Sequence, residues 1–336
     1  MSNKRVAING FGRIGRLTLR AYLESGRKDL DFVAINDLGS AEMNAHLLEF
    51  DSVHGRFPGE IAVTDGRLKT DGHDIAVLSE ATPEKLPWRN LGVDIVMECT
   101  GRFTDRDGAA KHLTAGAKRV LVSAPCKNAD LTVVYGVNHD KLTQSHHVVS
   151  NASCTTNCLA PVAQVLNQAI GIRHGYMTTI HAYTGDQRTV DTLHTDPYRA
   201  RAAAINLIPT STGAAKAVGL VLPELKGKLD GAAIRVPVPN VSLVDLTFSS
   251  ARPTSVEEIN AAMTKAAEGP LKGILGINAK PLVSSDFNHN ALSSIFDLEG
   301  TQVVDGTFCR VVSWYDNEWG FSNRMNDTAF AMGRLI

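Results

Sequence analysis

The chain has 336 residues, of which 43% are hydrophobic and 21% charged, and its formal net charge is -1. That composition is ordinary for a globular protein with a sizeable core, and it lacks the basic excess typical of nucleic-acid-binding proteins. No apolar run approaches the ~18 residues needed to span a bilayer, and the N-terminal residues lack the features of a signal peptide. We therefore expect a cytoplasmic protein with no membrane partner and no dedicated nucleic-acid partner.

Short strands and helices alternate through the first half of the chain. The elements predicted there, in chain order, are strand 4–10, helix 12–25, strand 31–37, a helix over about 43–50, an antiparallel excursion over 61–79, and strands 94–100, 119–123 and 147–150. Such an alternation is typical of a doubly wound parallel sheet of the Rossmann type.

The pattern changes after Ser150, where strands become longer and helices fewer. The elements predicted there are helix 154–170 capped by Ser153 or a neighbour, one long strand pattern over 232–250, helix 255–267, three strand runs over 282–315, and helix 319–335. We expect an α+β domain with a mixed, largely antiparallel sheet and helices on one face. The predicted domains are 1–152 and 153–318, with the helix at about 319–336 packing back on the first.

A glycine-rich turn joins the first strand to the first helix. Gly10, Gly12 and Gly15 form a GxGxxG pattern, and Asp37 lies at the end of the next strand. The glycines let the backbone approach a pyrophosphate at the helix N-terminus, and the acidic residue can accept hydrogen bonds from a ribose. Because Asp37 would repel a 2′-phosphate, the pattern favours NAD over NADP. The alternative is a structural glycine turn.

Two later strands of this half end in turns that can face the same ligand. They end near Thr100 and Ser123, and carboxyl ends of strands are where such ligands bind. Ligand binding and a purely structural turn are equally consistent with these two residues.

The five cysteines raise the question of which thiol is reactive. Their odd number makes a disulfide framework unlikely, and no cysteine or histidine spacing predicts a metal site. Cys154 is expected in the first turn of a helix, where the helix dipole favours the thiolate. Cys158, one turn further on, is expected to be buried and inert. A structural role for Cys154 is the alternative.

A reactive thiolate needs a proton-accepting partner, and a phosphorylated substrate needs anion sites. His181 follows a predicted strand, although a structural histidine has the same pattern. Thr212 and Gly213 begin a predicted helix, where hydroxyl and N–H groups can bind an anion. Arg235 lies within an apolar strand, where a guanidinium needs an anionic partner, either a ligand or a structural carboxylate.

Taken together, these residues resemble the glyceraldehyde-3-phosphate dehydrogenase family, over about residues 3–334. The resemblance is carried by six segments in order: INGFGRIGR, SNASCTTNCLAP, TIHAYTGDQ, PTSTGAAKAVG, RVPVPNVSLVDL and WYDNEWGFSNRM. It implies an NAD-dependent, phosphorylating oxidation of glyceraldehyde 3-phosphate through a cysteine thioester. It also implies a homotetramer with an S-shaped loop over about residues 183–206.

The resemblance further implies roles for individual residues. Cys154 is the implied nucleophile and His181 the implied base, which keeps the thiol ionised. The implied site for the substrate's own phosphate comprises Thr184, Asp186 and Arg235. The implied site for the attacking inorganic phosphate comprises Ser153, Thr155, Thr212 and Gly213, with Arg199 nearby. The implied cofactor contacts are Arg13 and Ile14 on the pyrophosphate and Asn317 on the nicotinamide carboxamide.

The chain departs from the family pattern at a few positions. Ala81 stands where many members have an arginine near the adenine, Phe321 where many have tyrosine, and Thr192 with Leu193 where many have leucine-proline. The nearest rival function is that of an erythrose-4-phosphate dehydrogenase. That family tends to lose the threonine after the histidine and the TGAAK segment, both of which this chain keeps. A rival of another class is a non-catalytic NAD-binding scaffold or an RNA-binding protein.

Overall fold

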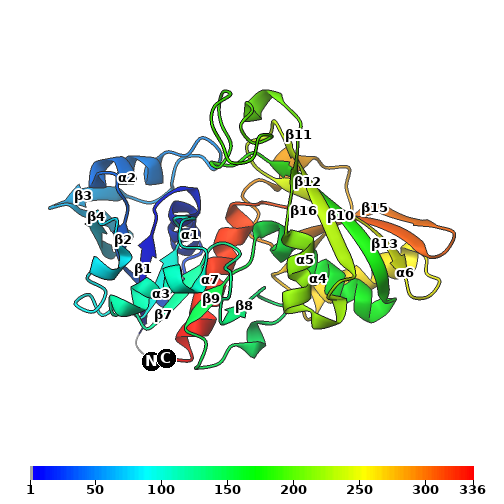
Figure 1. Cartoon of the computed structure of the whole chain (residues 1–336), viewed down its shortest axis with the longest axis horizontal. Coiled ribbons are helices and arrows are strands. Elements are labelled where there is room, and N and C mark those ends of the chain that lie inside the picture. Colours follow the sequence, from blue (N-terminus) through cyan, green and yellow to red (C-terminus); the bar gives the residue numbers. More distant parts are fainter. Residues whose placement is uncertain (1–2) are drawn as a thin grey trace. The chain divides into compact units, whose positions relative to one another are not determined.

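The computed structural model describes residues 3–336, which form two compact units (Figure 1). Unit 1 comprises the residues up to Tyr135 together with His139–Ala152 and Ser322–Ile336, and unit 2 comprises Gly136–Asn138 and Ser153–Phe321. Each unit is built around its own sheet. No helix among the described residues is long and apolar enough to cross a membrane.

Unit 1 contains a nine-stranded sheet in the order β3-β4-β5-β2-β1-β6-β7-β9-β8. Its strands are β1 (Lys4–Asn9), β2 (Leu30–Asn36), β3 (Ile61–Thr64), β4 (Arg67–Thr70), β5 (His73–Leu78), β6 (Ile95–Glu98), β7 (Arg119–Val122), β8 (Leu131–Thr132) and β9 (Val148–Ser150). All neighbours from β5 to β8 pair in parallel. The strand order reverses at β1, so the sheet is doubly wound, as the sequence predicted.

The antiparallel excursion over 61–79 is also confirmed. β3 pairs with β4 and β4 with β5 in antiparallel register. Both connecting turns place two successive residues at positive φ, namely Asp65 and Gly66, and Asp71 and Gly72. This is the turn geometry that matches the right-handed twist of a two-stranded hairpin.

Helices cover both faces of the unit 1 sheet. Helix α1 (Arg13–Glu24) lies on the Ile8 face, and α7 (Trp319–Gly333) donates the Asn326 amide to the Thr18 carbonyl of α1. Helix α3 (Arg106–Thr114) covers the opposite face, where Ala109 packs with buried valines (Figure 1). The remaining helix of this unit is α2 (Ala41–Glu49).

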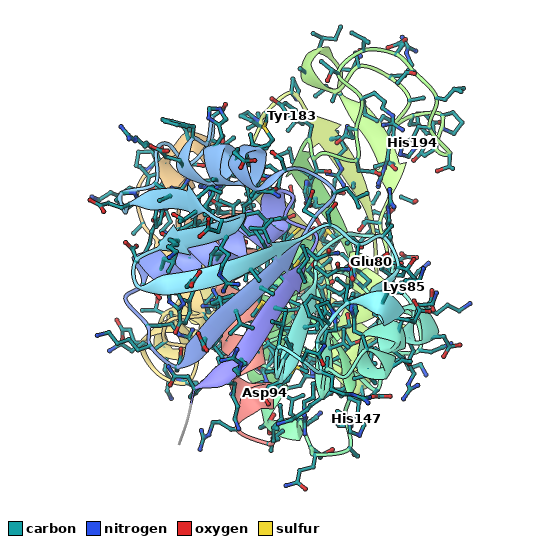
Figure 2. All side chains as sticks on the ribbon, turned by 90° about the vertical axis from the view of Figure 1, so that its left-hand side faces the viewer. Glu80, Lys85, Asp94, His147, Tyr183 and His194 are labelled. Carbon is teal, nitrogen blue, oxygen red and sulfur yellow. The ribbon has the colours of Figure 1, made fainter. Side chains whose placement is uncertain are left out.

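Figure 2 views the unit 1 sheet face on and separates its two ends. Asp94 marks the amino end of β6, and Glu80 follows the carboxyl end of β5. The carboxyl end is the edge at which ligands bind in sheets of this topology.

Unit 2 contains a mixed, largely antiparallel sheet of seven strands in the order β11-β12-β10-β13-β16-β15-β14. Its strands are β10 (Ile172–Ala182), β11 (Ile208–Ser211), β12 (Leu229–Val236), β13 (Ser242–Ser250), β14 (Leu275–Asn278), β15 (Ser294–Val304) and β16 (Phe308–Tyr315). Only β10–β12 and β14–β15 pair in parallel. Alternate residues of β13 are buried, which is the pattern of a sheet with one face against a core.

Three helices pack against this sheet: α4 (Cys154–Ala169), α5 (Ala214–Val221) and α6 (Val256–Glu268) (Figure 1). Ser153 caps α4 by accepting from the Thr156 N–H, and Ser255 caps α6 by accepting from the Glu258 N–H. These caps satisfy backbone donors that the first turn of a helix leaves unpaired, and they fix where each helix begins.

Two strand predictions for this unit were wrong. The run over 232–250 is two strands rather than one, because Pro237 and Pro239 lack the N–H groups that a continuing ladder requires. Val241, at a φ of 67°, completes the reversal into β13. Residues 282–315 contain two strands rather than three, since Ser284–Phe287 form a 3₁₀ turn.

Candidate active site

A pocket in unit 1 lies at the carboxyl ends of β1, β2, β5 and β6, where the strand order reverses. Its lining includes the predicted residues Gly10, Gly12, Asp37 and Thr100, and the remaining lining residues are Asn9, Asn36, Leu38, Glu80, Ala81, Cys99, Arg102 and Phe103. The structure thus brings four of the predicted cofactor residues together. The lining does not include Arg13, Ile14, Gly15 or Ser123.

The three glycines of the GxGxxG turn differ in their backbone conformation and in the space around them. Gly10 has a φ of 90°, and a Cβ there would lie 2.6 Å from the Thr100 backbone nitrogen. A Cβ on Gly15 would lie 2.1 Å from the Gly10 carbonyl oxygen. Gly12 is the N-cap of α1, makes no side-chain cap, and faces open space. A turn of this kind leaves the helix N-terminus accessible to a pyrophosphate.

Two charged residues beside this turn are already engaged within the protein. Asp37 accepts hydrogen bonds from the Phe11 N–H at 2.7 Å and the Gly39 N–H at 3.1 Å, which fixes its carboxylate at the pocket edge. Arg13 pairs with the buried carboxylate of Asp51. Burial opposes ionisation of Asp51, but the His54 N–H and Arg13 outweigh it and lower its pKa to about 2.

In unit 2, Cys154 is the first residue of α4 and is partly exposed. Its Sγ lies 3.5 Å from Nε2 of His181, whose side chain is buried near the end of β10. Nδ1 of His181 lies 2.7 Å from the Ala182 carbonyl oxygen. That oxygen can only accept, so a neutral imidazole that bonds to it carries its proton on Nδ1, and the lone pair of Nε2 then faces the sulfur.

Arg235 reaches the same place from the neighbouring strand. β12 pairs in parallel with β10 so that Arg235 stands directly beside His181. Its Nη1 lies 3.0 Å from His181 Nδ1 and donates to the Ala182 carbonyl oxygen, also at 3.0 Å. Its Nε is buried without a hydrogen-bond partner, and no carboxylate of residues 3–336 forms a salt bridge with it.

The surroundings shift the pKa values of all three groups. Burial, then the positive charge of Arg235, lowers the pKa of His181 to about 3. Burial raises the pKa of the Cys154 thiol, while Arg235 acts in the opposite direction. Burial, then the charge of Arg199, lowers the pKa of Arg235. A neutral imidazole beside a thiol, with cations nearby, is a base ready to accept the thiol proton when an anionic ligand arrives.

The starts of helices α4 and α5 lie together next to Cys154. Thr156 Oγ1 donates to the Ala214 carbonyl at 3.3 Å, which ties the two helix starts to each other. Ser153 and Thr212 each accept a backbone N–H of their own helix turn, at 3.0 Å and 3.2 Å. Gly213, the N-cap of α5, is exposed. The predicted residues Ser153, Thr212 and Gly213 therefore lie at two adjoining helix N-termini.

Thr155, which was predicted at the same anion site, turns its hydroxyl inward. Its Oγ1 lies 2.8 Å from the Tyr315 hydroxyl, which lies 2.9 Å from Thr179 Oγ1. The Tyr315 ring packs edge-on against His181, with 6.0 Å between ring centres. Tyr315 was missed by the sequence analysis, since a tyrosine at the end of an apolar strand carries no distinguishing signal.

The loop after β10 holds a second charged cluster (Figure 2 labels Tyr183 and His194). Asp186 accepts from Arg199 at 2.7 Å and contacts His194 Nε2 at 3.3 Å. Asp186 is thus paired with Arg199 rather than bonded to Arg235, and burial of its carboxylate is outweighed by these bonds, which lower its pKa. Thr184 is partly exposed in the same loop.

Asn317 is buried just after β16. Ser242 accepts the Ala182 N–H at 3.0 Å and donates to Asn317 Oδ1 at 2.8 Å. This chain of bonds links Asn317 to the residue after His181. It also fixes the Oδ1 end of the Asn317 side-chain amide against Ser242.

The other four thiols differ from Cys154 in their surroundings. All five cysteines are unpaired. Cys158 is fully buried, contacts Ser294 at 3.4 Å, and has its pKa raised by burial to about 12. Burial likewise raises the pKa of Cys99 to about 12 and that of Cys126 to about 11. Cys309 is also buried, with a pKa raised by burial.

Comparison with known proteins finds one family over nearly the whole chain. The family model described as glyceraldehyde 3-phosphate dehydrogenase, NAD binding domain, matches residues 4–106, and that of the C-terminal domain matches residues 153–317. Proteins named glyceraldehyde-3-phosphate dehydrogenase from Xanthobacter flavus and Cereibacter sphaeroides are 68% and 66% identical, over 98% and 99% of this chain and 99% of each relative. The relative from Geobacillus stearothermophilus is 58% identical over 97% of both chains. This chain belongs to the glyceraldehyde 3-phosphate dehydrogenase family.

Proposed function

We propose that this protein oxidises D-glyceraldehyde 3-phosphate with NAD and inorganic phosphate to give 1,3-bisphosphoglycerate, a glycolytic and gluconeogenic step. The observation that carries the proposal is the 3.5 Å approach of Cys154 Sγ to His181 Nε2 beside an arginine without a carboxylate partner. A nucleophile, a base and a free cation are the groups that a phosphorylated aldehyde requires.

In the first step the thiol proton moves from Cys154 Sγ to His181 Nε2, and the thiolate attacks the aldehyde carbon. The helix dipole of α4 and Arg235 stabilise the negative sulfur. The developing oxyanion then takes the proton from the imidazolium, which gives a neutral thiohemiacetal. The low pKa of His181 favours that return of the proton.

Oxidation requires the hydroxyl proton and a hydride to leave the thiohemiacetal. NAD, when bound, accepts the hydride. His181 Nε2 accepts the hydroxyl proton, and the product is a thioester on Cys154. The Cys154 backbone N–H and the imidazole stabilise negative charge on the oxygen during both steps.

Inorganic phosphate then attacks the thioester carbon, the C–S bond breaks, and the acyl phosphate leaves with the Cys154 thiolate restored. Ser153, Thr212 and Gly213 at the two helix starts would hold this phosphate, with the Thr155 backbone and Arg199 nearby. Arg235, with Thr184 and Asp186, would hold the substrate's own phosphate. The unpartnered Nε of Arg235 supports that assignment.

Four of the proposed cofactor residues, Gly10, Gly12, Asp37 and Thr100, line the unit 1 pocket. Gly10, Gly12 and Gly15 would admit the pyrophosphate, with Arg13 and Ile14 at the helix start, and Asp37 would bind the ribose. Thr100 and Ser123 end neighbouring strands. Asn317, whose Oδ1 accepts from Ser242, would hold the nicotinamide carboxamide with its side-chain amide nitrogen. Residues 1–152 would bind NAD, with helix 319–336 packed on them, and 153–318 would carry catalysis.

We further propose a cytoplasmic homotetramer. The loop over 183–206 and Leu207 directly after it carry large apolar side chains that are mostly exposed, including Leu193 at 91%, Ile205 at 80% and Leu207 at 70%. A loop that exposes several large apolar side chains is typical of an interaction surface, which supports a subunit interface here.

The test is NADH formation, followed by absorbance, with and without inorganic phosphate and with erythrose 4-phosphate as a second substrate. We expect turnover that requires phosphate and prefers the three-carbon substrate. Phosphate-independent turnover that is faster on erythrose 4-phosphate would instead establish the rival dehydrogenase. Absence of any turnover, with NAD still bound, would establish a non-catalytic binding protein.

A further inference from the structure

A cluster of polar side chains, all buried except that of Thr100, lies at the dinucleotide pocket of unit 1, and three of its members line that pocket. We call it the Glu98 network, and its members are Asn9, Asn36, Trp88, Glu98, Thr100 and His112. Glu98 is 2% exposed, and His112 and Trp88 are fully buried. The surrounding side chains are apolar, so an ionisable pair here is costly unless every polar atom is bonded. None of these residues takes part in the chemistry at Cys154.

The carboxylate of Glu98 accepts four hydrogen bonds. Oε1 accepts the backbone N–H of Thr100 at 2.8 Å and also the Thr100 hydroxyl. Oε2 accepts the side-chain amide of Asn9 at 2.6 Å and Nε2–H of His112 at 3.0 Å. These four donors occupy the lone-pair positions of a carboxylate, which leaves no place for a proton or a water.

Trp88 and Asn36 fix the directions in which His112 and Asn9 donate their hydrogen bonds to Glu98. The indole N–H of Trp88 can only donate, and it donates to His112 Nδ1 at 2.9 Å. The proton of a neutral His112 therefore lies on Nε2, facing Glu98. On the other side, Asn36 donates to Asn9 Oδ1 at 2.7 Å, which turns the Asn9 amide nitrogen toward Glu98.

The network ends at two pieces of backbone that line the pocket. Thr100 Oγ1 accepts the Arg102 N–H at 3.1 Å, so the Thr100 side chain links Glu98 to the turn that follows it. Gly10 packs so closely on this turn that a Cβ would lie 2.6 Å from the Thr100 nitrogen. A displacement of the Thr100 turn therefore displaces Gly10, the first glycine of the pyrophosphate loop.

We propose that Glu98, oriented by His112 and Trp88, is a positioning residue that holds the Thr100 turn and the Gly10 loop in the shape that binds the dinucleotide. This inference rests on the proposed function only in that the pocket binds NAD. It predicts an effect on NAD binding that is separate from the chemistry of Cys154.

The substitution Glu98→Gln would place hydrogen-bond donors against one another in the network. The amide of E98Q has one acceptor and one donor end, whereas all four neighbours donate. If its oxygen faces Thr100, its NH₂ meets Nε2–H of His112, which Trp88 prevents from changing tautomer. If its oxygen faces His112, the Thr100 turn loses its acceptor. Either arrangement leaves a buried donor unpaired.

A second substitution removes part of that conflict. In W88F/E98Q no indole N–H occupies His112 Nδ1, so the proton can move to Nδ1, and Nε2 can accept from the new amide. The amide oxygen then stays with Thr100. A loss of packing alone would predict that the second substitution makes binding worse, whereas the network predicts that it makes binding better.

The test is calorimetric measurement of the NAD dissociation constant for the full-length wild type, E98Q, W88F, W88F/E98Q and W314F/E98Q, with melting temperatures. Trp314 is the matched control, because its indole donates to Asp297 in unit 2 at 2.9 Å. We expect E98Q to weaken NAD binding by about tenfold or more, with kcat at saturating NAD nearly unchanged. We expect W88F/E98Q, but not W314F/E98Q, to recover part of that loss.

Two results would overturn the proposal: wild-type NAD affinity in E98Q, or a folded W88F/E98Q that binds no better than folded E98Q. If the E98Q protein can be obtained only in unfolded form, the NAD affinity of the single variant W88F tests the proposal. A loss of about twofold to tenfold in NAD affinity supports the network, and unchanged affinity refutes it. Failure of the proposed function is a separate result, since the wild type would then bind NAD without phosphate-dependent turnover.

Discussion

Two polar clusters of this chain, the Glu98 network and the Cys154 site, differ in one respect that separates their roles. In the Glu98 network of unit 1, four donors converge on a carboxylate and occupy all its acceptor positions. At the Cys154 site of unit 2, Arg235 has no carboxylate partner among the residues that the structure describes, and its buried Nε makes no hydrogen bond with them. A complete network holds backbone in place, whereas an incomplete one is ready for a ligand that brings the missing charge.

The largest expected loss of activity comes from a substitution of Cys154, the first of the two cysteines of α4. Cys154→Ser removes the nucleophile, so we expect turnover to fall by roughly 10⁴-fold or more. Cys158→Ser is the matched control on the same helix, and it should keep most of the activity because that sulfur is buried against Ser294. Steady-state rates measure both variants. Equal losses would mean that the reactive thiol has been misassigned.

The next largest loss of activity is expected from a substitution of His181, the proposed base. His181→Asn removes the acceptor of the thiol proton, and we expect kcat to fall by about 10²- to 10⁴-fold. NAD binding should stay near the wild-type value, because the pocket residues belong to unit 1. Parallel kinetics and calorimetry separate the two quantities. An unchanged kcat would contradict the role of the imidazole as a base.

A substitution of Arg235 tests whether the Cys154 site binds an anionic substrate group. Arg235→Gln removes the cation, so we expect KM for the phosphorylated aldehyde to rise by roughly tenfold to a hundredfold. Because Arg235 lowers the pKa of Cys154, the variant's thiol pKa should rise. The pH profile of Cys154 alkylation should therefore shift to higher pH. If KM and profile are both unchanged, Arg235 is a structural residue.

The smallest effect is on stability and concerns Asp51, whose carboxylate holds Arg13. The pKa of Asp51 in the folded chain, about 2, lies below the ordinary value of an unfolded aspartate, about 3.9. The hydrogen bonds that the His54 N–H and Arg13 donate to the ionised carboxylate thus stabilise the fold above the unfolded pKa, and this contribution is lost as the pH falls toward 2.

We accordingly expect Asp51→Asn to lower the free energy of unfolding by about 1–2 kcal/mol at neutral pH, a figure reduced for the partial exposure of Arg13. Urea unfolding at a series of pH values measures it. The difference from the wild type should be constant above about pH 5 and shrink below pH 4. A difference that grows in acid would have the wrong sign for this mechanism.

Local pattern predicted much of the fold and pointed to those candidate site residues that lie at the ends of strands and helices. Gly10, Gly12 and Asp37 were identifiable because a strand, a turn and a helix follow one another in sequence. Cys154 was identifiable because Ser153 caps the helix that begins there. Each of these signals lies within a few residues of the group that it predicts, so no tertiary structure is needed.

What sequence could not supply depends on contacts across the sheets. Arg235 meets His181 because β12 and β10 pair in one register, and no spacing reveals that pairing. Glu98 looks like any acidic residue near a strand end, and His112 like any helical histidine, until the fold brings them to 3.0 Å. The break between β12 and β13 was missed because the alternating pattern resumes after Val241.

The most direct test of the account is a single mixing of the enzyme–NAD complex with glyceraldehyde 3-phosphate in the absence of phosphate. The account predicts a burst of about one NADH per active site that then stalls, because the thioester on Cys154 waits for its acceptor. Addition of phosphate should release the stall, and Cys154→Ser should show no burst. Steady turnover without phosphate, or a burst in that variant, would contradict the central claim that Cys154 forms a thioester and that the open cluster admits phosphate to cleave it.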